Sequence, residues 1–126
     1  MQITSFNPLI VTKDSENIIK LFEELGFERR HQKDGINDKD ITSFDLKDPN
    51  GFRVNVTQVD TVPQDMTTIR MNVRDFNEAY ELLKSKGFVN AQGDKITDTG
   101  SSISTMMVSP TGFSISISEH IRKEDK

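Results

Sequence analysis

The sequence repeats itself at an offset of about 61 residues, and this duplication constrains the fold more than any other feature of the chain. Asp14 recurs as Asp75, and the pair Gly26-Phe27 recurs as Gly87-Phe88. Further matches at the same offset are Pro49 with Pro110 and Gly51-Phe52 with Gly112-Phe113. Because no net insertion separates the two halves, each half is expected to be one copy of the same structural unit.

Each half predicts a strand, a helix and then three shorter strands, the order βαβββ. An aspartate precedes each helix, where its carboxylate can accept hydrogen bonds from the first free backbone N–H groups. A glycine, Gly26 or Gly87, follows each helix, where a left-handed residue ends a helix most easily. Apolar residues recur at helical spacing between these signals. They are Ile18, Ile19, Phe22 and Leu25 in the first half, and Phe76, Ala79, Tyr80, Leu82 and Leu83 in the second.

The strand after each Pro-x-Gly turn alternates between apolar and polar residues. Val54 and Val56 point to one face, while Arg53, Asn55 and Thr57 point to the other. In the second half, Ile115 and Ile117 oppose Ser114, Ser116 and Ser118. One face of each sheet is therefore expected to be core and the other polar.

These elements predict a single α+β domain, residues 1–126, made of two tandem βαβββ modules. Module one is expected at residues 1–58, a linker containing Pro63 at 59–66, and module two at 67–121. The short linker favours side-by-side packing, with strands curving around a shared trough and the helices outside. Residues 122–126 carry both charge signs and are expected to fray.

Composition narrows the classes of function. The chain has no cysteine, which excludes disulfides, thiolate metal sites and thiol nucleophiles. A net charge of −4 lacks the basic footprint of a nucleic-acid binder. No apolar run approaches the roughly 18 residues that a membrane span needs. We therefore expect no nucleic-acid or membrane partner and a cytoplasmic location.

The order of these motifs resembles that of the glyoxalase and bleomycin-resistance proteins of the vicinal oxygen chelate superfamily, which also includes extradiol dioxygenases. The first half reads N-P-L-I-V-T-K-D, then a helix ending L-F-E-E-L-G-F, then D-P-N-G-F-R-V-N-V, and the second half echoes it. The resemblance covers nearly the whole chain and depends on the duplicated order. It implies an open eight-stranded barrel or trough, a homodimer, and a divalent metal ion bound in the trough.

The resemblance also implies four metal-ligand positions, where His, Gln or Glu is expected. In this sequence they fall on Asn7, Asn55, Thr68 and Ser116. Neutral amides and hydroxyls supply no charge to offset the dehydration of a divalent ion, and transition metals prefer imidazole and carboxylate. We therefore expect a member of the superfamily without a metal ion or other cofactor.

Other residues offer little to rebuild such a site. His31 and His120 are the two histidines of the chain and are expected on the surface. Glu119 should point away from the side of Ser116, because adjacent residues of a strand face opposite sides. A shifted metal site remains an alternative.

The polar face of the inner strands carries two arginines, Arg53 and Arg70. A guanidinium presents a planar fork of donors that suits a carboxylate or phosphate. The alternative is that both arginines lie at the rim, solvated or paired with acidic residues. The serines of the last strand have no histidine nearby to act as a base, so a serine hydrolase is not expected.

The sequence thus predicts a metal-independent protein of the glyoxalase and bleomycin-resistance type that binds or sequesters a small polar or anionic molecule in the trough between the modules. No catalytic residue is expected. The predicted ligand-binding residues are Asn7, Arg53, Asn55, Thr68, Arg70 and Ser116. Two alternatives stay open: a metal-dependent lyase, isomerase or dioxygenase with an unorthodox metal site, and a scaffold whose outer edge strands only mediate dimerisation.

Overall fold

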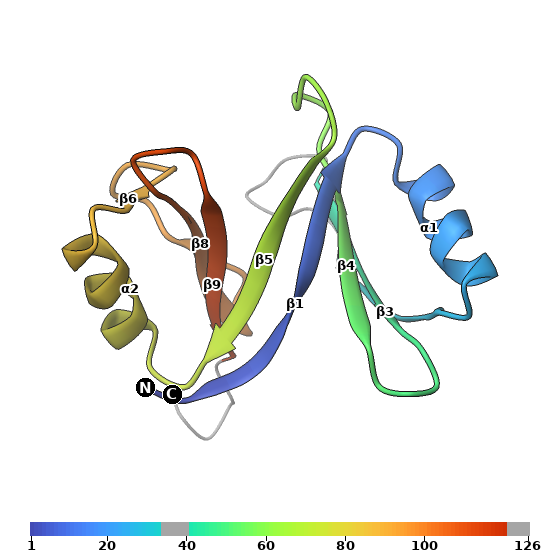
Figure 1. The fold of residues 1–126 in the computed structure, drawn as a ribbon, viewed down its shortest axis with the longest axis horizontal. Helices are drawn as coiled ribbons and strands as arrows, with labels where there is room; N and C mark the ends of the chain where they lie inside the picture. Colours follow the sequence, from blue (N-terminus) through green and yellow to red (C-terminus); the bar gives the residue numbers. More distant parts are fainter. Residues whose placement is uncertain (34–40, 121–126) are drawn as a thin grey trace. The chain divides into compact units, whose positions relative to one another are not determined.

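A computed structural model describes residues 1–33 and 41–120 of the chain, apart from the side chains of His31 and Lys33. Residues 122–126, the expected frayed tail, lie outside the described residues. The described part forms two helices and nine strands (Figure 1). In order they are β1 (Ile3–Thr12), α1 (Ser15–Glu24), β2 (Glu28–Lys33), β3 (Thr42–Lys47), β4 (Arg53–Gln58), β5 (Met66–Val73), α2 (Phe76–Ser85), β6 (Val89–Asn90), β7 (Thr97–Asp98), β8 (Ser102–Val108) and β9 (Ser114–His120).

The chain divides into two compact units, each with one helix packed on a sheet. The first module comprises residues 7–67, and the second comprises residues 1–6 together with the described residues from 68 onward. Strand β1 is shared, because its residues up to Phe6 belong to the second module and those from Asn7 to the first. The predicted α+β class with two duplicated modules is confirmed.

In the first module the strand order is β2-β3-β4-β1, with β1 parallel to β4 and the other neighbours antiparallel. Leu9 of β1 lies beside Asn55 of β4, and Asp45 of β3 lies on the other side of Asn55. Helix α1 covers one face of this sheet (Figure 1). The core between them consists of Ile19, Phe44, Leu46, Val54 and Val56, with Ile10, Ile18, Phe22 and Phe27 at its margin.

The second module repeats this plan with β5 parallel to β9 and β8 antiparallel to β9. The start of β1 lies beside β5, where the backbone N–H of Arg74 donates to Gln2 O at 3.0 Å. Helix α2 packs on β8 and β9 (Figure 1). The core consists of Met71, Val73, Phe76, Ala79, Leu83, Met107 and Ile117.

The second module differs from the prediction of three strands after the helix, because two short strands, β6 and β7, stand where one was expected. A turn with Gly93 at a φ of 74° separates them. The side chain of Gln92 in this turn donates to Thr97 Oγ1 and to Thr105 Oγ1, both at 3.1 Å. These bonds fold the turn back onto β8 and interrupt the strand.

The predicted helix ends are confirmed. Asp14 Oδ1 accepts a hydrogen bond from the N–H of Asn17, and Asp75 Oδ1 accepts one from the N–H of Glu78. Gly26 and Gly87 follow the helices with φ of 105° and 92°.

Two residues expected on the apolar helix faces are instead exposed. Leu25 is 62% exposed because it caps the C-terminus of α1, beyond the last turn that contacts the sheet. Leu82 of α2 is 43% exposed, on a different side of the helix from the buried Ala79 and Leu83. No helix in the described part of the chain is both long enough and apolar enough to cross a membrane.

The sheet of each module therefore has one face covered by its helix and an opposite face, here called the helix-free face. The predicted alternation is confirmed on β4, where Val54 and Val56 are in the core and Asn55 lies between them on the other face. On β8, Met107 is fully buried in the core, so the adjacent Met106 belongs to the helix-free face. The predicted ligand-binding residues all lie on helix-free faces.

Candidate functional site

On the helix-free face of the first module, two asparagines at expected metal-ligand positions contact each other. Asn7 Nδ2 donates a hydrogen bond to Asn55 Oδ1 over 2.6 Å, and both side chains are buried. The same amide nitrogen donates to Pro8 O at 2.9 Å. The two expected ligand positions of this module are therefore joined directly by a hydrogen bond.

The orientation of the Asn7 amide is set by its neighbours. Pro8 O is a carbonyl and can only accept, so the group that faces it must be the NH₂ of Asn7. This leaves Asn7 Oδ1 buried and without a hydrogen-bond partner in the described part of the chain. A buried unpaired carbonyl is costly, and such atoms in folded proteins call for an explanation.

Arg53 lies at the start of β4 on the same face. Its Nη1 contacts Asp45 Oδ2 at 2.8 Å, and the Arg53 side chain is 42% exposed. Arg53 thus pairs with an acidic residue of its own module. This agrees with the alternative that Arg53 lies at the rim, paired with an acidic residue.

On the helix-free face of the second module, β5 and β9 form three side-by-side residue pairs. The first pair is closed by hydrogen bonds: Thr68 Oγ1 donates to Ser114 O at 2.7 Å, and Ser114 Oγ donates to Thr68 Oγ1 at 2.8 Å. The third pair is closed as well, because Ser118 Oγ donates to Asn72 Oδ1. Both outer serines of β9 therefore use their hydroxyl protons inside the protein.

The middle pair is Arg70 and Ser116, which are aligned in the parallel ladder. Both residues are half-buried. Unlike its two neighbours on β9, the Ser116 hydroxyl makes no side-chain hydrogen bond to any residue in the described ranges. Ser116 therefore keeps its hydroxyl proton available beside the guanidinium.

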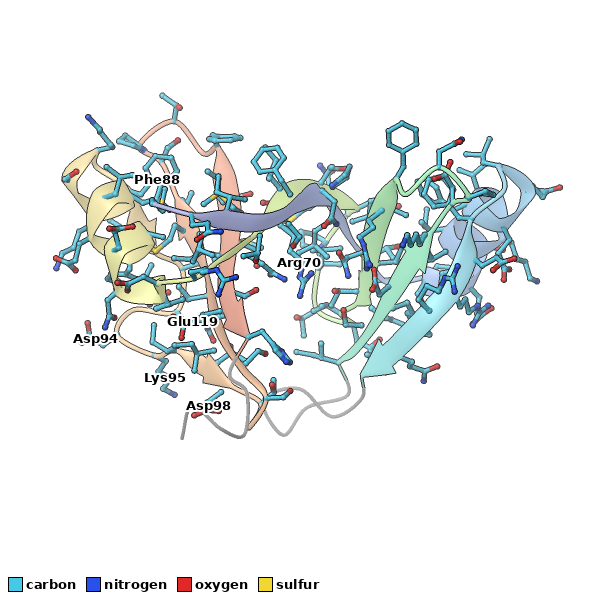
Figure 2. All side chains as sticks on the ribbon, turned by 90° about the horizontal axis from the view of Figure 1, so that it is seen from below. Arg70, Phe88, Asp94, Lys95, Asp98 and Glu119 are labelled. Atoms are coloured by element: carbon cyan, nitrogen blue, oxygen red, sulfur yellow. The ribbon has the colours of Figure 1, made fainter. Side chains whose placement is uncertain are left out.

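Arg70 and Glu119 lie on opposite faces of the second module's sheet. Figure 2 shows Glu119 toward α2 and Arg70 on the side away from that helix. Glu119 Oε1 accepts a hydrogen bond from the N–H of Phe76, the first residue of α2, at 2.7 Å. The predicted direction of Glu119 is thus confirmed. Its carboxylate accepts a hydrogen bond at the N-terminus of α2.

The central rung, meaning the three aligned residues in the middle of each helix-free face, differs between the modules. In the first module it is Leu9, Asn55 and Asp45. In the second module it is Arg70, Ser116 and Met106. Each residue of the first rung lies about 61 positions before its counterpart in the second. The basic Arg70 therefore stands where the first module has the apolar Leu9, and the apolar Met106 stands where the first module has the acidic Asp45. Asp45 was not among the residues predicted for this face, and neither was its relation to Met106, although the repeat offset matches the two positions.

The residues at the expected metal-ligand positions do not fit a divalent metal ion. Asn55 Oδ1 accepts from Asn7, and the Thr68 hydroxyl accepts from Ser114, so these oxygens already have partners. All four positions are neutral, which leaves the charge of a divalent ion uncompensated. The described residues also contain no group of three or more His, Cys, Asp or Glu side chains that could hold a metal ion. His120 is exposed at the end of β9, and the side chain of His31 lies outside the described part.

Comparison with known proteins identifies the fold. No protein-family model matches the sequence, and no curated protein sequence matches it. Methylmalonyl-CoA epimerase from Mycobacterium tuberculosis is similar in structure with a TM-score of 0.73 at 16% identity, over 97% of this chain and 91% of that one. A glyoxalase/bleomycin resistance protein/dioxygenase superfamily member from Vibrio splendidus 12B01 gives a TM-score of 0.61 at 15% identity, over 94% of this chain and 99% of that one.

Glyoxalase I from Zea mays matches with a TM-score of 0.65 at 13% identity, over 94% of this chain but 44% of its own length. This chain therefore spans less than half of the maize enzyme. At sequence identities this low, the TM-scores establish a shared fold and nothing further. The chain has the vicinal oxygen chelate fold, the fold whose members its duplicated motifs resemble.

Proposed function

We propose that this chain binds a small polar or anionic molecule on the helix-free faces of its modules without a metal ion. The residues assigned to this role are those predicted from the sequence. They are Asn7, Arg53 and Asn55 in the first module, and Thr68, Arg70 and Ser116 in the second. No residue is assigned a catalytic role.

The observation that carries the proposal is the hydrogen bond between Asn7 and Asn55. The two bonded amides are neutral groups, and they stand at two positions where the superfamily resemblance implies ligands of a metal ion. Asn7 Oδ1 is buried and has no hydrogen-bond partner among residues 1–33 and 41–120, which supports the same conclusion, since a ligand N–H or O–H is one group that could satisfy it. These amides supply hydrogen bonds and no Lewis acid.

Two measurements on the full-length protein test the proposal. Elemental analysis after purification without chelator should find less than about a tenth of an equivalent of transition metal, and added Ni²⁺, Zn²⁺, Mn²⁺ or Fe²⁺ should not raise the melting temperature. A metabolite and antibiotic library should contain a compound that does raise it, because a ligand at about 100 times its Kd stabilises the folded state by about 2.7 kcal/mol. The chain lacks tryptophan, so circular dichroism is the suitable signal.

Two variants locate the binding. Replacing Asn7 and Asn55 together by leucine should abolish the ligand-induced stabilisation while leaving the fold intact. The control is Asn77→Ala, an exposed position of α2, which should respond to the ligand as the unaltered protein does. Stoichiometric tight binding of a transition metal, or a library in which no compound stabilises the protein, would contradict the proposal.

The proposal includes a homodimer and a cytoplasmic location. The resemblance implies the dimer, and the absence of cysteine from the sequence agrees with a reducing compartment. Light scattering after size-exclusion chromatography should give twice the mass of 14.3 kDa. A monomer at micromolar concentration would contradict this part alone.

A further inference from the structure

We infer that the turn between β3 and β4 is a site of non-enzymatic modification, at which Asn50 reacts to give aspartate and isoaspartate, and that Asp48 slows this reaction. The inference is independent of the proposed function. Asn50 and Gly51 form the one Asn-Gly pair of the sequence. Both residues are exposed in the turn that joins the two strands (Figure 1).

The reaction needs no enzyme and consumes one water molecule. The backbone nitrogen of Gly51 gives up its proton and attacks Cγ of Asn50, so that a new N–Cγ bond forms. The Cγ–Nδ2 bond breaks, and Nδ2 takes up a proton and leaves as ammonia, which produces a five-membered succinimide. Water then opens the ring at either carbonyl and gives aspartate or isoaspartate. A glycine after the asparagine favours the attack, because it has no side chain to obstruct it or to restrict the backbone.

Asp48 engages the reacting groups in hydrogen bonds. The N–H of Gly51 donates to Asp48 O at 3.1 Å, so the proton that must leave is already shared. Asp48 Oδ1 accepts from the N–H of Asn50 at 3.0 Å and from the N–H of Phe52 at 2.8 Å. Asn50 Nδ2 donates to Asp48 Oδ2 at 3.4 Å. The succinimide is therefore expected to form only after the turn opens and these bonds are lost.

The restraint is partial, because the three hydrogen bonds to the Asp48 carboxylate are exposed to solvent. Exposed hydrogen bonds of this kind open locally, at a small fraction of the free energy of global unfolding. Asn50 is therefore expected to react slowly in the folded protein, and faster once the Asp48 side chain is removed.

The equivalent turn of the second module shares this geometry without the reactive residue. The N–H of Gly112 donates to Ser109 O at 3.0 Å, and Ser109 Oγ accepts from the N–H of Phe113 at 3.0 Å. Ser109 thus takes the place of Asp48. Thr111 stands where the first module has Asn50, and it has no carboxamide from which a succinimide could form. The modification is therefore specific to the turn of the first module.

Isoaspartate changes the course of the main chain. The chain then passes through Cβ and Cγ of the former asparagine, which adds one methylene group between β3 and β4. The reaction also adds a carboxylate close to that of Asp48, and like charges repel. Both changes weaken the turn that sets the register of Lys47 against Arg53. The modified protein should therefore melt at a lower temperature than the unmodified one.

The test incubates the purified full-length protein at mildly alkaline pH, which favours loss of the Gly51 proton, and analyses it by trypsin digestion and mass spectrometry. Cleavage after Lys47 and Arg53 releases residues 48–53 as one peptide. Its aspartate and isoaspartate forms, separated by chromatography, should accumulate with time above their level in a sample digested without incubation. Peptides that contain other asparagines should change much more slowly.

Four variants test the role of the turn. Asp48→Ala should raise the rate by about fivefold, the factor that corresponds to a lost interaction of about 1 kcal/mol. Asp48→Ser introduces the residue of the second module and should keep the rate close to that of the unaltered protein. Ser109→Ala is the matched control, because it loosens the other turn and should leave the rate at Asn50 unchanged. Asn50→Thr should abolish the reaction in this peptide.

The results separate the site from its restraint. If residues 48–53 stay unmodified in the folded protein but react in protein unfolded by guanidinium chloride, the turn is not a modification site. Equal rates for Asp48→Ala and the unaltered protein, or an equal acceleration by Ser109→Ala, would overturn the role of Asp48. If Asp48→Ala does not fold, the comparison of Asp48→Ser with the unaltered protein, folded and unfolded, decides the question.

Discussion

Asn7 and Asn55 are joined by a hydrogen bond of 2.6 Å between the amide nitrogen of the first and the amide oxygen of the second, and both are buried. Within the described part, this bond satisfies one oxygen and leaves Asn7 Oδ1 without a partner. An arrangement that helped stability alone would not retain an unpaired buried carbonyl, because two apolar residues of similar shape avoid that cost. Compared with two apolar residues, the pair therefore lowers the stability of the fold. Ligand binding can explain why such a pair is present.

The first prediction concerns this pair. Asn7→Leu should lower the free energy of unfolding by about 1–3 kcal/mol, because it leaves Asn55 Oδ1 buried without a donor. The double replacement of Asn7 and Asn55 by leucine should recover the whole loss and bring the free energy of unfolding to that of the unaltered protein or above it, since both polar partners are then gone. Urea denaturation followed by circular dichroism measures both values.

The control for this experiment is Asn77→Ala on the exposed side of α2, which should change the free energy of unfolding by less than about 0.5 kcal/mol. Additive losses in the double variant would show that the two amides do not act as a pair.

Much of the fold follows from local chemistry that a sequence displays. The N-caps Asp14 and Asp75, the glycines after the helices and the alternation of Val54 with Asn55 depend on residues close together in the chain, so they are predictable. The duplication adds the long-range information, because it requires both halves to use one plan.

The features that were not predicted depend on side-chain contacts and strand register, which residue patterns alone leave open. The split of one strand into β6 and β7 follows from hydrogen bonds of Gln92 to Thr97 and Thr105, which no local pattern displays. The ion pair of Arg53 with Asp45 requires the register of β3 against β4, and alternation alone leaves that register open. The direct bond between Asn7 and Asn55 likewise depends on two parallel strands meeting.

The second prediction compares the glycines that end the two helices. Gly26→Ala should lower the free energy of unfolding by roughly 1–2 kcal/mol, the usual cost of a left-handed alanine, because nothing lies within 4 Å of the added Cβ. Gly87→Ala should cost more, since its Cβ would lie 3.2 Å from Pro110 Cγ. Adding Pro110→Ala to Gly87→Ala should remove the difference between the two sites in urea denaturation. Equal losses from the two single variants would contradict the importance of this contact.

The third prediction concerns the first N–H groups of the helices. Glu119 Oε1 accepts from the N–H of Phe76, and at the equivalent place in the first module Gln58 Oε1 accepts from the N–H of Ser15 at 3.3 Å. Glu119→Gln should keep the hydrogen bond but lose the favourable interaction of a carboxylate with the helix N-terminus, a loss of about 0.3–1 kcal/mol. Glu119→Ala should lose more, because the N–H of Phe76 then lacks its acceptor.

Thermal denaturation at low and high salt measures both Glu119 variants. The difference between the unaltered protein and Glu119→Gln should shrink at high salt, since salt screens the charge. A difference that salt does not change would instead indicate that the glutamine fails to form the hydrogen bond.

The last prediction concerns the ion pair of Arg53 with Asp45. Arg53 Nη1 lies 2.8 Å from Asp45 Oδ2, so this carboxylate competes with any anion for the guanidinium. Asp45→Met removes the carboxylate, and the Arg53 Nε–H of nitrogen-15-labelled protein should then respond to inorganic phosphate, a response expected to be small in the unaltered protein. The new response should weaken at high salt, because the Arg53 side chain is 42% exposed and salt screens an exposed charge. If Asp45→Met leaves Arg53 silent, the ion pair is not what keeps an anion from this arginine.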